Sequence, residues 1–295
     1  MKVLTIASVS SIPGVVSDND IILEYADRLR ISKTVQTSEV LRPFILNRRT
    51  LQSLGFRRLI SLLVEGSYFR DTKVTWLPIL SLRKKPGIHA LASIVQVLLY
   101  SPLLLAKYRN ITIAHASVIY PDLPISFVLA SLCRTRVVIT LRTEIKYFNS
   151  FLLSKVTHIL FRYVSHALIM NEQALRIAKA TNIDATKWHH PVSEHFYSAA
   201  KLCDSHRSGM LCVSRLIKMK NVDIVIKSFA GYLVKGGRND SMLTIIGEGP
   251  ERCYLESLSE SLGISEYVRF LGQCSSKEVA EIMRRNRILC NVSDK

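Results

Sequence analysis

The final third of the chain alternates regularly between short runs of β-forming residues and segments in which apolar residues recur at helical spacing. The β-forming runs predict strands at residues 210–214, 242–246, 267–271 and 288–292. One helical segment with short connections separates each run from the next. Strands joined in this way pair in parallel through right-handed crossovers. This part of the chain is therefore predicted to form an open, doubly wound α/β sheet.

Residues that start and stop helices support this pattern. Pro250 stands at the expected first turn of the helix after the second strand, and Gly263 stands where that helix should end. Ser275 and Glu278 have the spacing of a capping box, which predicts a helix N-terminus after the third strand.

The first part of the chain also predicts an α/β sheet, with a less regular pattern. Strands are expected at 3–9, 111–114, 137–141 and 167–170, and helices at 20–29, near 57–65, at 90–106 and at 151–165. The polar segment 189–209 lacks periodic apolar positions and is interpreted as an interdomain connection. We therefore expect two domains, residues 1–195 and residues 205–295.

Positive charge is concentrated in the first half of the chain. Residues 1–165 hold 22 Lys and Arg against 9 Asp and Glu, whereas residues 166–295 hold 18 against 14. This bias suits an anionic partner, such as an acidic membrane surface, a pyrophosphate-linked lipid or a nucleic acid. A solvated surface that serves only solubility is an equal alternative.

The apolar segments do not predict a membrane-spanning protein. The most apolar segment, residues 90–106, is short for a bilayer span and is interrupted by Gln96, Ser101 and Pro102, so a buried or interfacial helix is expected there. The N-terminus is interpreted as a strand rather than a signal peptide. The six cysteines show no C-x-x-C pair and no regular spacing, which indicates reduced thiols in a cytoplasmic protein.

Two cations flank the first connection of the regular pattern. Arg215 comes just after the predicted strand at 210–214, and Lys220 comes just before the following helix. Both positions are expected at the carboxyl edge of a parallel sheet and beside a helix N-terminus, where anions bind. A pyrophosphate fits such a site, although two basic residues in a loop are more often plain solvated surface.

The same residues resemble a known family. CVSRLIKMKNVDIVIKSFA at 212–230, IIGEGPERCYLESL at 245–258 and VRFLGQCSSKEVAEIM at 268–283 are similar, in this order, to segments of the retaining glycosyltransferases of family 4. These enzymes have the GT-B fold of two Rossmann-like domains. The resemblance implies that Arg215 and Lys220 are the catalytic residues that hold the diphosphate of a nucleoside diphosphate sugar. It covers residues 210–295 well and the first domain more loosely.

The resemblance also implies where the nucleotide would lie. Gly247, Glu248, Gly249 and Gly272 would face it from the second domain, and Gly14 would face the phosphates from the first. A tight turn without ligand contact is the other reading of Gly247, Gly249 and Gly14. No cofactor and no metal are expected, since the two cations can neutralise the charge of the diphosphate.

The acceptor side is less well defined by the sequence. The family often has a histidine and a glycine where this chain has Arg142 and Thr143. Glu144 is expected to be the only acidic residue near the edge of the first sheet, either as a base or as a surface carboxylate. The adjacent His189 and His190 are interpreted as polar hinge residues rather than metal ligands.

The resemblance predicts further sequence beyond the last strand. In the family a loop with two glutamates eight positions apart follows the strand that matches residues 288–292, and these residues hold the donor sugar and ribose. We therefore expect a second domain that is incomplete, with marginal stability because a sheet edge and an apolar helix face are exposed.

Taken together, the sequence predicts a glycosyltransferase that moves a hexose from a nucleoside diphosphate sugar to a membrane-associated or oligosaccharide acceptor of a surface glycan. It would be a cytoplasmic protein, peripheral on the inner face of the membrane, with no nucleic acid partner. The alternatives are a GT-B nucleotide-sugar epimerase and a non-catalytic remnant that binds anionic ligands or membranes.

Overall fold

The computed structural model divides into two compact units, Met1–Pro191 and Val192–Lys295. Each unit is described by itself. The structure describes residues 1–8, 21–32, 34–46, 52, 55, 57, 61, 65–80, 86–141, 151–189, 192, 194–197, 207–236 and 241–293.

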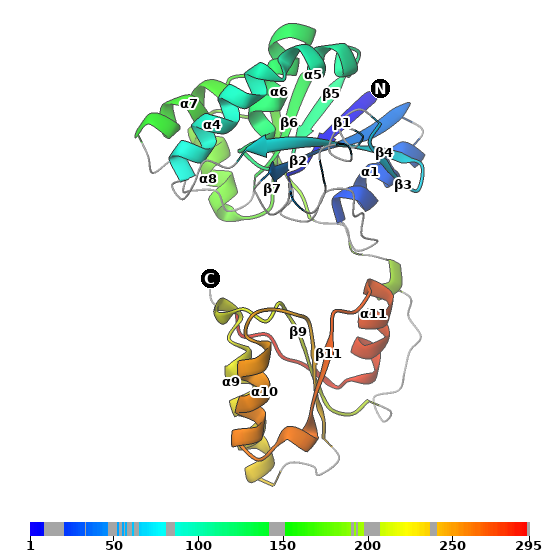
Figure 1. The fold of residues 1–295 in the computed structure, drawn as a ribbon, viewed down its shortest axis with the longest axis vertical. Helices are drawn as coiled ribbons and strands as arrows, with labels where there is room; N and C mark the ends of the chain where they lie inside the picture. Colours follow the sequence, from blue (N-terminus) through cyan, green and yellow to red (C-terminus); the bar gives the residue numbers. More distant parts are fainter. Residues whose placement is uncertain are drawn as a thin grey trace. The chain divides into compact units, whose positions relative to one another are not determined.

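The first unit is built on an eight-stranded sheet (Figure 1). Its strands lie in the order β3-β4-β2-β1-β5-β6-β7-β8. All neighbouring pairs are parallel except β3 and β4, which are antiparallel. The strands are β1 (Lys2–Ile6), β2 (Thr37–Leu46), β3 (Ser67–Phe69), β4 (Thr72–Leu80), β5 (Ile113–Ala116), β6 (Arg136–Leu141), β7 (Val164–Ile169) and β8 (Ala185–Lys187).

Helices cover both faces of this sheet because side chains along each strand alternate between the faces. Leu41 and Leu77 pack with residues of α4, α5 and α6, whereas Val40 and Trp76 pack with α1 on the opposite face. The helices are α1 (Ile21–Ile31), α4 (Pro86–Leu99), α5 (Ser101–Tyr108), α6 (Asp122–Cys133), α7 (Phe151–Phe161) and α8 (Glu172–Ala180). The arrangement is the doubly wound α/β sheet that the sequence predicts.

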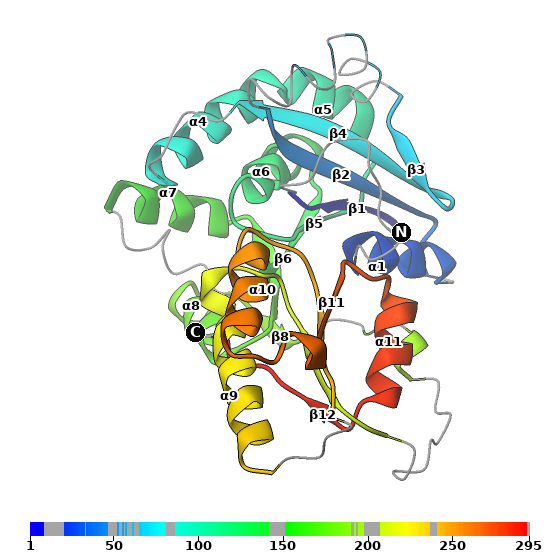
Figure 2. The ribbon, with the colours of Figure 1, turned by 60° about the horizontal axis from the view of Figure 1, so that its bottom comes forward.

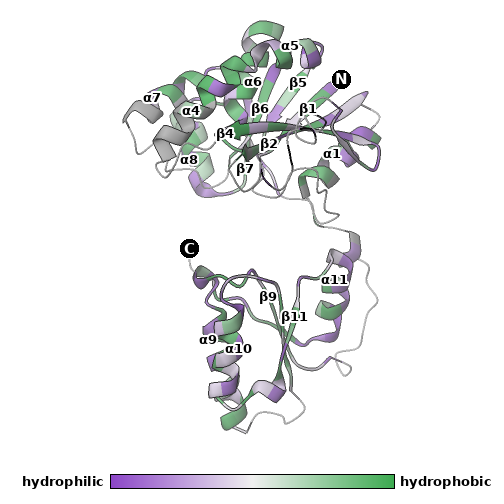
Figure 3. Ribbon diagram, viewed as in Figure 1, coloured by the Kyte–Doolittle hydropathy of each residue, from purple (hydrophilic) through white to green (hydrophobic). Residues whose placement is uncertain are grey.

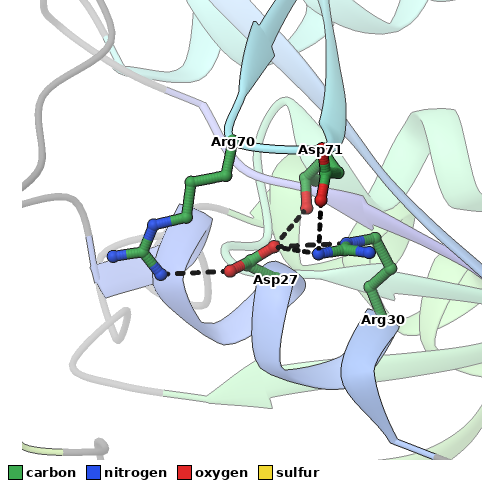
Figure 4. A network of polar contacts seen from close by, with 5 residues as sticks. Asp27, Arg30, Arg70 and Asp71 are labelled. Atoms are coloured by element: carbon green, nitrogen blue, oxygen red, sulfur yellow. Dashed lines mark hydrogen bonds and ion pairs between the residues drawn. The ribbon is translucent and has the colours of Figure 1, made fainter.

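A buried carboxylate fastens α1 to the turn between β3 and β4 (Figure 4). Asp27 is 2% exposed and accepts hydrogen bonds from Arg30, from Arg70 at 3.1 Å and from the Thr72 hydroxyl at 3.3 Å. Arg30 also pairs with Asp71. Burial raises the pKa of Asp27, but the hydrogen bonds from Arg70 and Arg30 outweigh burial and hold the pKa below its usual value.

Asp27→Asn is expected to destabilise the first unit by about 2 kcal/mol at neutral pH, because the charge-assisted hydrogen bonds are lost. The lowered pKa means that the wild-type contribution is present at neutral pH and is lost as the pH falls through the folded-state pKa. Urea unfolding followed by fluorescence should therefore show that the free energy of unfolding falls less between pH 7 and pH 3 in the variant than in the wild type. Asp71→Asn is the control, since its carboxylate is 78% exposed and should contribute little.

The second unit contains a four-stranded parallel sheet in the order β11-β10-β9-β12. Helices α9 and α10 lie on one side of it and α11 on the other (Figures 1 and 2). The elements are β9 (Met210–Val213), α9 (Val222–Val234), β10 (Leu243–Ile246), α10 (Arg252–Ser261), β11 (Val268–Gly272), α11 (Ser276–Arg285) and β12 (Ile288–Leu289). The capping box is confirmed, because the Ser275 hydroxyl accepts from the Glu278 N–H and the Glu278 carboxylate accepts from the Ser275 N–H.

Several predicted boundaries are wrong. The helix expected at 90–106 is two helices that meet at Tyr100, because Pro102 has no N–H with which to continue the α4 ladder. Pro250 precedes α10 rather than lying in its first turn. The last strand spans only two residues instead of five, and it pairs on one side only, with β9. The expected helix near 57–65 lies mostly outside the described residues.

The five described cysteines are free thiols, and Cys203 lies outside the described residues. Among the described helices, none is both long enough and apolar enough to cross a bilayer.

Candidate functional site

Two loops of the second unit meet where the strand order of its sheet reverses. The chain leaves β9 toward β10 on one side, and β12 pairs with β9 on the other side. The loops after β9 and β12 contact each other through Asn221 Nδ2, which donates to the Val292 carbonyl at 3.1 Å, and through Lys220 Nζ, which donates to Ser293 Oγ at 3.3 Å. Open α/β sheets bind ligands at this kind of switch point, at the carboxyl ends of the strands.

Backbone hydrogen bonds join the loops after β9, β10 and β11 into one layer. The Leu216 N–H donates to the Glu248 carbonyl at 3.0 Å, and the Glu251 N–H donates back to the Leu216 carbonyl at 3.0 Å. The Gly247 N–H donates to the Gly272 carbonyl at 2.8 Å. Because the Leu216 side chain is fully buried, it anchors the layer in the core of the unit. Gly247, Glu248, Gly249 and Gly272 are therefore brought together with the segment that carries Arg215.

Two glycines of this layer are required by the close approach of the loops. Gly247 has φ +138°, and a Cβ there would overlap the carbonyl oxygen of Ser214. A Cβ on Gly249 would overlap the carbonyl oxygen of Leu216. Backbone packing thus accounts for both glycines without a ligand. Contact of Gly247, Gly249 and Gly272 with a nucleotide stays a prediction.

Arg215 and Lys220 both lie in the connection from β9 to α9. Arg215 is exposed, and its guanidinium makes no hydrogen bond or ion pair with the part of the chain that the structure describes. Lys220 ends the 3₁₀ turn Lys218–Lys220, which places it two residues before α9. Helix N-termini favour anions because of the helix dipole and the N–H groups that point out of the first turn. That Arg215 and Lys220 together hold a pyrophosphate stays a prediction.

Glu248 lies over the turn at Gly272 and is partly neutralised. Its carboxylate pairs with Arg252, whose Nε donates to Glu256 Oε1 at 2.9 Å. A Cβ added to Gly272 would lie 2.8 Å from Glu248 Oε1. The ion pair reduces the repulsion that a bare carboxylate would exert on a phosphate, while the carboxylate oxygens can still accept hydrogen bonds from hydroxyl groups.

A groove of about 540 Å³ opens between the loop after β9 and α10. It is lined by Ile217, Lys218, Asn221, Val222, Asp223, Glu251, Tyr254 and Leu255. Neither Arg215 nor Lys220 is part of its lining. Asn221, with φ +49°, links this groove to the segment after β12, and sequence reasoning missed it. The position of Asn221 just before a helix could have indicated a cap, but its amide bonds the Val292 carbonyl instead.

The first unit has a buried carboxylate at the corresponding edge of its own sheet. Asp122 is fully buried and accepts from the Ser8 N–H at 3.1 Å and from the Val118 N–H at 3.2 Å, which ties the end of β1 to the loop after β5. The expectation that Glu144 is the only acidic residue near this edge is wrong. Glu144 itself, Arg142, Thr143 and Gly14 lie outside the described residues.

His189 and His190 are the adjacent histidines that are interpreted from the sequence as hinge residues. His189 is exposed, and His190 lies outside the described residues. No group of three potential ligands among His, Cys, Asp and Glu is found in the described residues.

The second unit matches a known family model. Residues 195–295 match the family described as "Glycosyl transferases group 1". A stretch of 86 residues is 30% identical to N-acetyl-alpha-D-glucosaminyl L-malate synthase of Bacillus anthracis. This stretch covers 29% of the chain and 21% of that protein, so the alignment spans about a fifth of the relative.

Solved structures share the architecture over nearly the whole chain. HepE of Anabaena in complex with UDP has a TM-score of 0.63 at 16% identity, with 99% of this chain and 74% of that chain covered. The lipopolysaccharide outer core galactosyltransferase WaaB has a TM-score of 0.56 at 14% identity, with the same coverage. At such identities the likeness defines the fold, which is the α/β fold of the GT-B glycosyltransferases, with four strands in the second sheet.

Proposed function

We propose that this protein is a retaining glycosyltransferase that moves a hexose from a nucleoside diphosphate sugar to a hydroxyl group of a surface glycan. One observation carries the proposal: Arg215 and Lys220 lie in the connection from β9 to α9, at the switch point of a sheet, and neither makes an ion pair with the residues that the structure describes. The segment that holds them matches the glycosyl transferases group 1 family, and the solved HepE structure of the same fold contains UDP.

In the proposed site, Arg215 and Lys220 bind the diphosphate and stabilise it as it leaves the sugar. Negative charge builds up on the leaving group as the glycosidic bond to the sugar breaks, and fixed cations in place before reaction favour that state. Arginine can donate two parallel hydrogen bonds to a phosphate, and lysine supplies a point charge. The nucleotide lies near Gly247, Glu248 and Gly272, and the reaction needs no metal ion.

The acceptor is proposed to be lipid-linked or otherwise associated with a membrane. The positive charge of the first half of the chain supports this, since an anionic surface attracts such a domain. The protein would then work at the inner face of the membrane as a peripheral protein.

Titration of UDP into the full chain by calorimetry tests the donor site. Binding is expected with UDP, weaker binding with UMP, and the same affinity after addition of a chelator. Equal affinities for UDP and UMP would contradict a site built around the diphosphate.

Product analysis separates transfer from the alternative enzyme. A transferase releases UDP and lengthens the acceptor, whereas an epimerase returns an altered UDP-sugar and needs no acceptor. Appearance of an epimeric nucleotide sugar would reject transfer.

A further inference from the structure

The outer face of α4 and α5 exposes a row of large apolar side chains. Val95, Leu98, Leu99 and Leu103 are 58%, 52%, 75% and 41% exposed. The first three are spaced i, i+3 and i+4 and therefore share one face of α4. Val97, by contrast, is buried in the core beneath the helix. We call these four exposed residues the α4–α5 apolar surface.

This segment differs from an ordinary surface helix. Such a helix has one apolar stripe toward the core and a charged face toward water. Residues 86–106 contain no Asp, Glu, Lys or Arg, and apolar residues run along both helices (Figure 3). With 14 residues in α4 and 8 in α5, neither helix can span a bilayer. Val97, Leu104 and Tyr108 pack into the core on one side, and among the described residues the other side exposes the four apolar side chains of the α4–α5 apolar surface.

The sequence that contains this surface is basic. Residues 72–171 contain twelve Lys and Arg but only two acidic residues, Asp122 and Glu144. Asp122 is fully buried, so it contributes nothing to the surface. Arg109 directly follows α5 and is exposed, and Lys155 and Arg162 are exposed on and beside α7, which contacts α4.

Exposed apolar residues beside exposed cations suit a lipid bilayer with acidic headgroups. Apolar side chains enter the boundary between headgroups and acyl chains, and Lys and Arg lie at the phosphate level. A second copy of this chain is a poorer partner for this surface. The chain has a net charge of +17, so the cations beside the surface in two copies would repel each other.

We propose that the α4–α5 apolar surface inserts into the interface of an anionic membrane, with Arg109, Lys155 and Arg162 on its headgroups. This deepens the proposed function by naming the membrane-binding surface. The surface lies within the first unit and is separate from the donor-site residues of the second, so each can be tested without the other.

The test is flotation of the full chain with vesicles of phosphatidylcholine alone or with 30% phosphatidylglycerol, in the absence of nucleotide. The wild type should bind the anionic vesicles at physiological salt. The double variant Leu98→Gln and Leu99→Gln should reduce the bound fraction at least tenfold. Ile31→Gln is the matched control, because Ile31 is 68% exposed on α1, which covers the opposite face of the sheet, and its binding should equal wild type.

A tryptophan at the surface reports insertion directly. Fluorescence of Leu99→Trp should be quenched by brominated acyl chains beyond the background from Trp76 and Trp188. Absence of that quenching, or vesicle binding that the double variant leaves intact, would overturn the proposal. So would a lipid-free dimer, seen by analytical ultracentrifugation, that the double variant dissociates. The double variant should bind UDP with the affinity of the wild type. If UDP does not bind even the wild type, the proposed donor site is contradicted, whereas the vesicle result still tests membrane binding.

Discussion

Replacing both Arg215 and Lys220 by alanine is expected to weaken UDP binding by about a thousandfold. Each cation is proposed to make a charge-assisted hydrogen bond to the diphosphate, worth about 2 kcal/mol, and tenfold in affinity corresponds to about 1.4 kcal/mol. The single variants should each lose about thirtyfold. Calorimetry with UDP measures the effect, and circular dichroism checks that the fold is intact. Both side chains lie in loops outside the core, so little loss of stability is expected.

Lys218→Ala is the matched control. Lys218 is exposed in the same 3₁₀ turn and has the same charge, but it lines the groove beside α10 rather than flanking the switch point. Its removal should change UDP affinity by less than about threefold, which is the size of a surface-charge effect. A loss as large as that of Lys220→Ala would mean that general positive charge, and not a specific diphosphate site, attracts the nucleotide. Arg215→Lys should recover only part of the binding, because lysine lacks the two-pronged geometry of arginine.

The order of the elements in the second unit could be predicted from sequence because its signals are local. Strands, helices and the capping box at Ser275 depend on residues within a few positions of one another. In the first unit, β2 was missed because Arg42 and Pro43 interrupt its apolar pattern. Arg42 is nonetheless 2% exposed, in a strand that β1 and β4 flank on its two sides. Tertiary pairing overrides the local signal at such positions.

The site was predictable in part for the same reason. Arg215 and Lys220 follow and precede recognisable elements, so their place at the sheet edge can be predicted. The contact of Asn221 with Val292 joins positions 71 residues apart, and that of Asp122 with Ser8 joins positions 114 residues apart. No local pattern encodes these contacts. Sequence reasoning also could not decide whether Gly247 serves a turn or a ligand, because the overlapping atom belongs to Ser214 on a different strand end.

Gly247→Ala is expected to destabilise the second unit by about 4 kcal/mol, which combines two costs. At φ +138° an alanine is strained by about 1–3 kcal/mol, and its Cβ would overlap the carbonyl oxygen of Ser214, a residue whose N–H is bonded to the Ile246 carbonyl. Both tryptophans lie in the first unit, so unfolding of the second is best measured by hydrogen exchange of peptides within residues 210–293.

Two glycine variants in the same unit separate these costs. Gly263 also has a positive φ, +67°, but a Cβ there has no neighbour within 4 Å, so Gly263→Ala should cost about 1 kcal/mol, the strain alone. Gly231 lies inside α9 with open space around it, so Gly231→Ala should stabilise the unit by about 0.5–1 kcal/mol. If Gly247→Ala costs no more than Gly263→Ala, the loops after β9 and β10 do not need their close approach. Gly247 would then not be explained by packing. The UDP affinity of Gly247→Ala, measured with the unit still folded, would decide whether the glycine is needed for nucleotide binding.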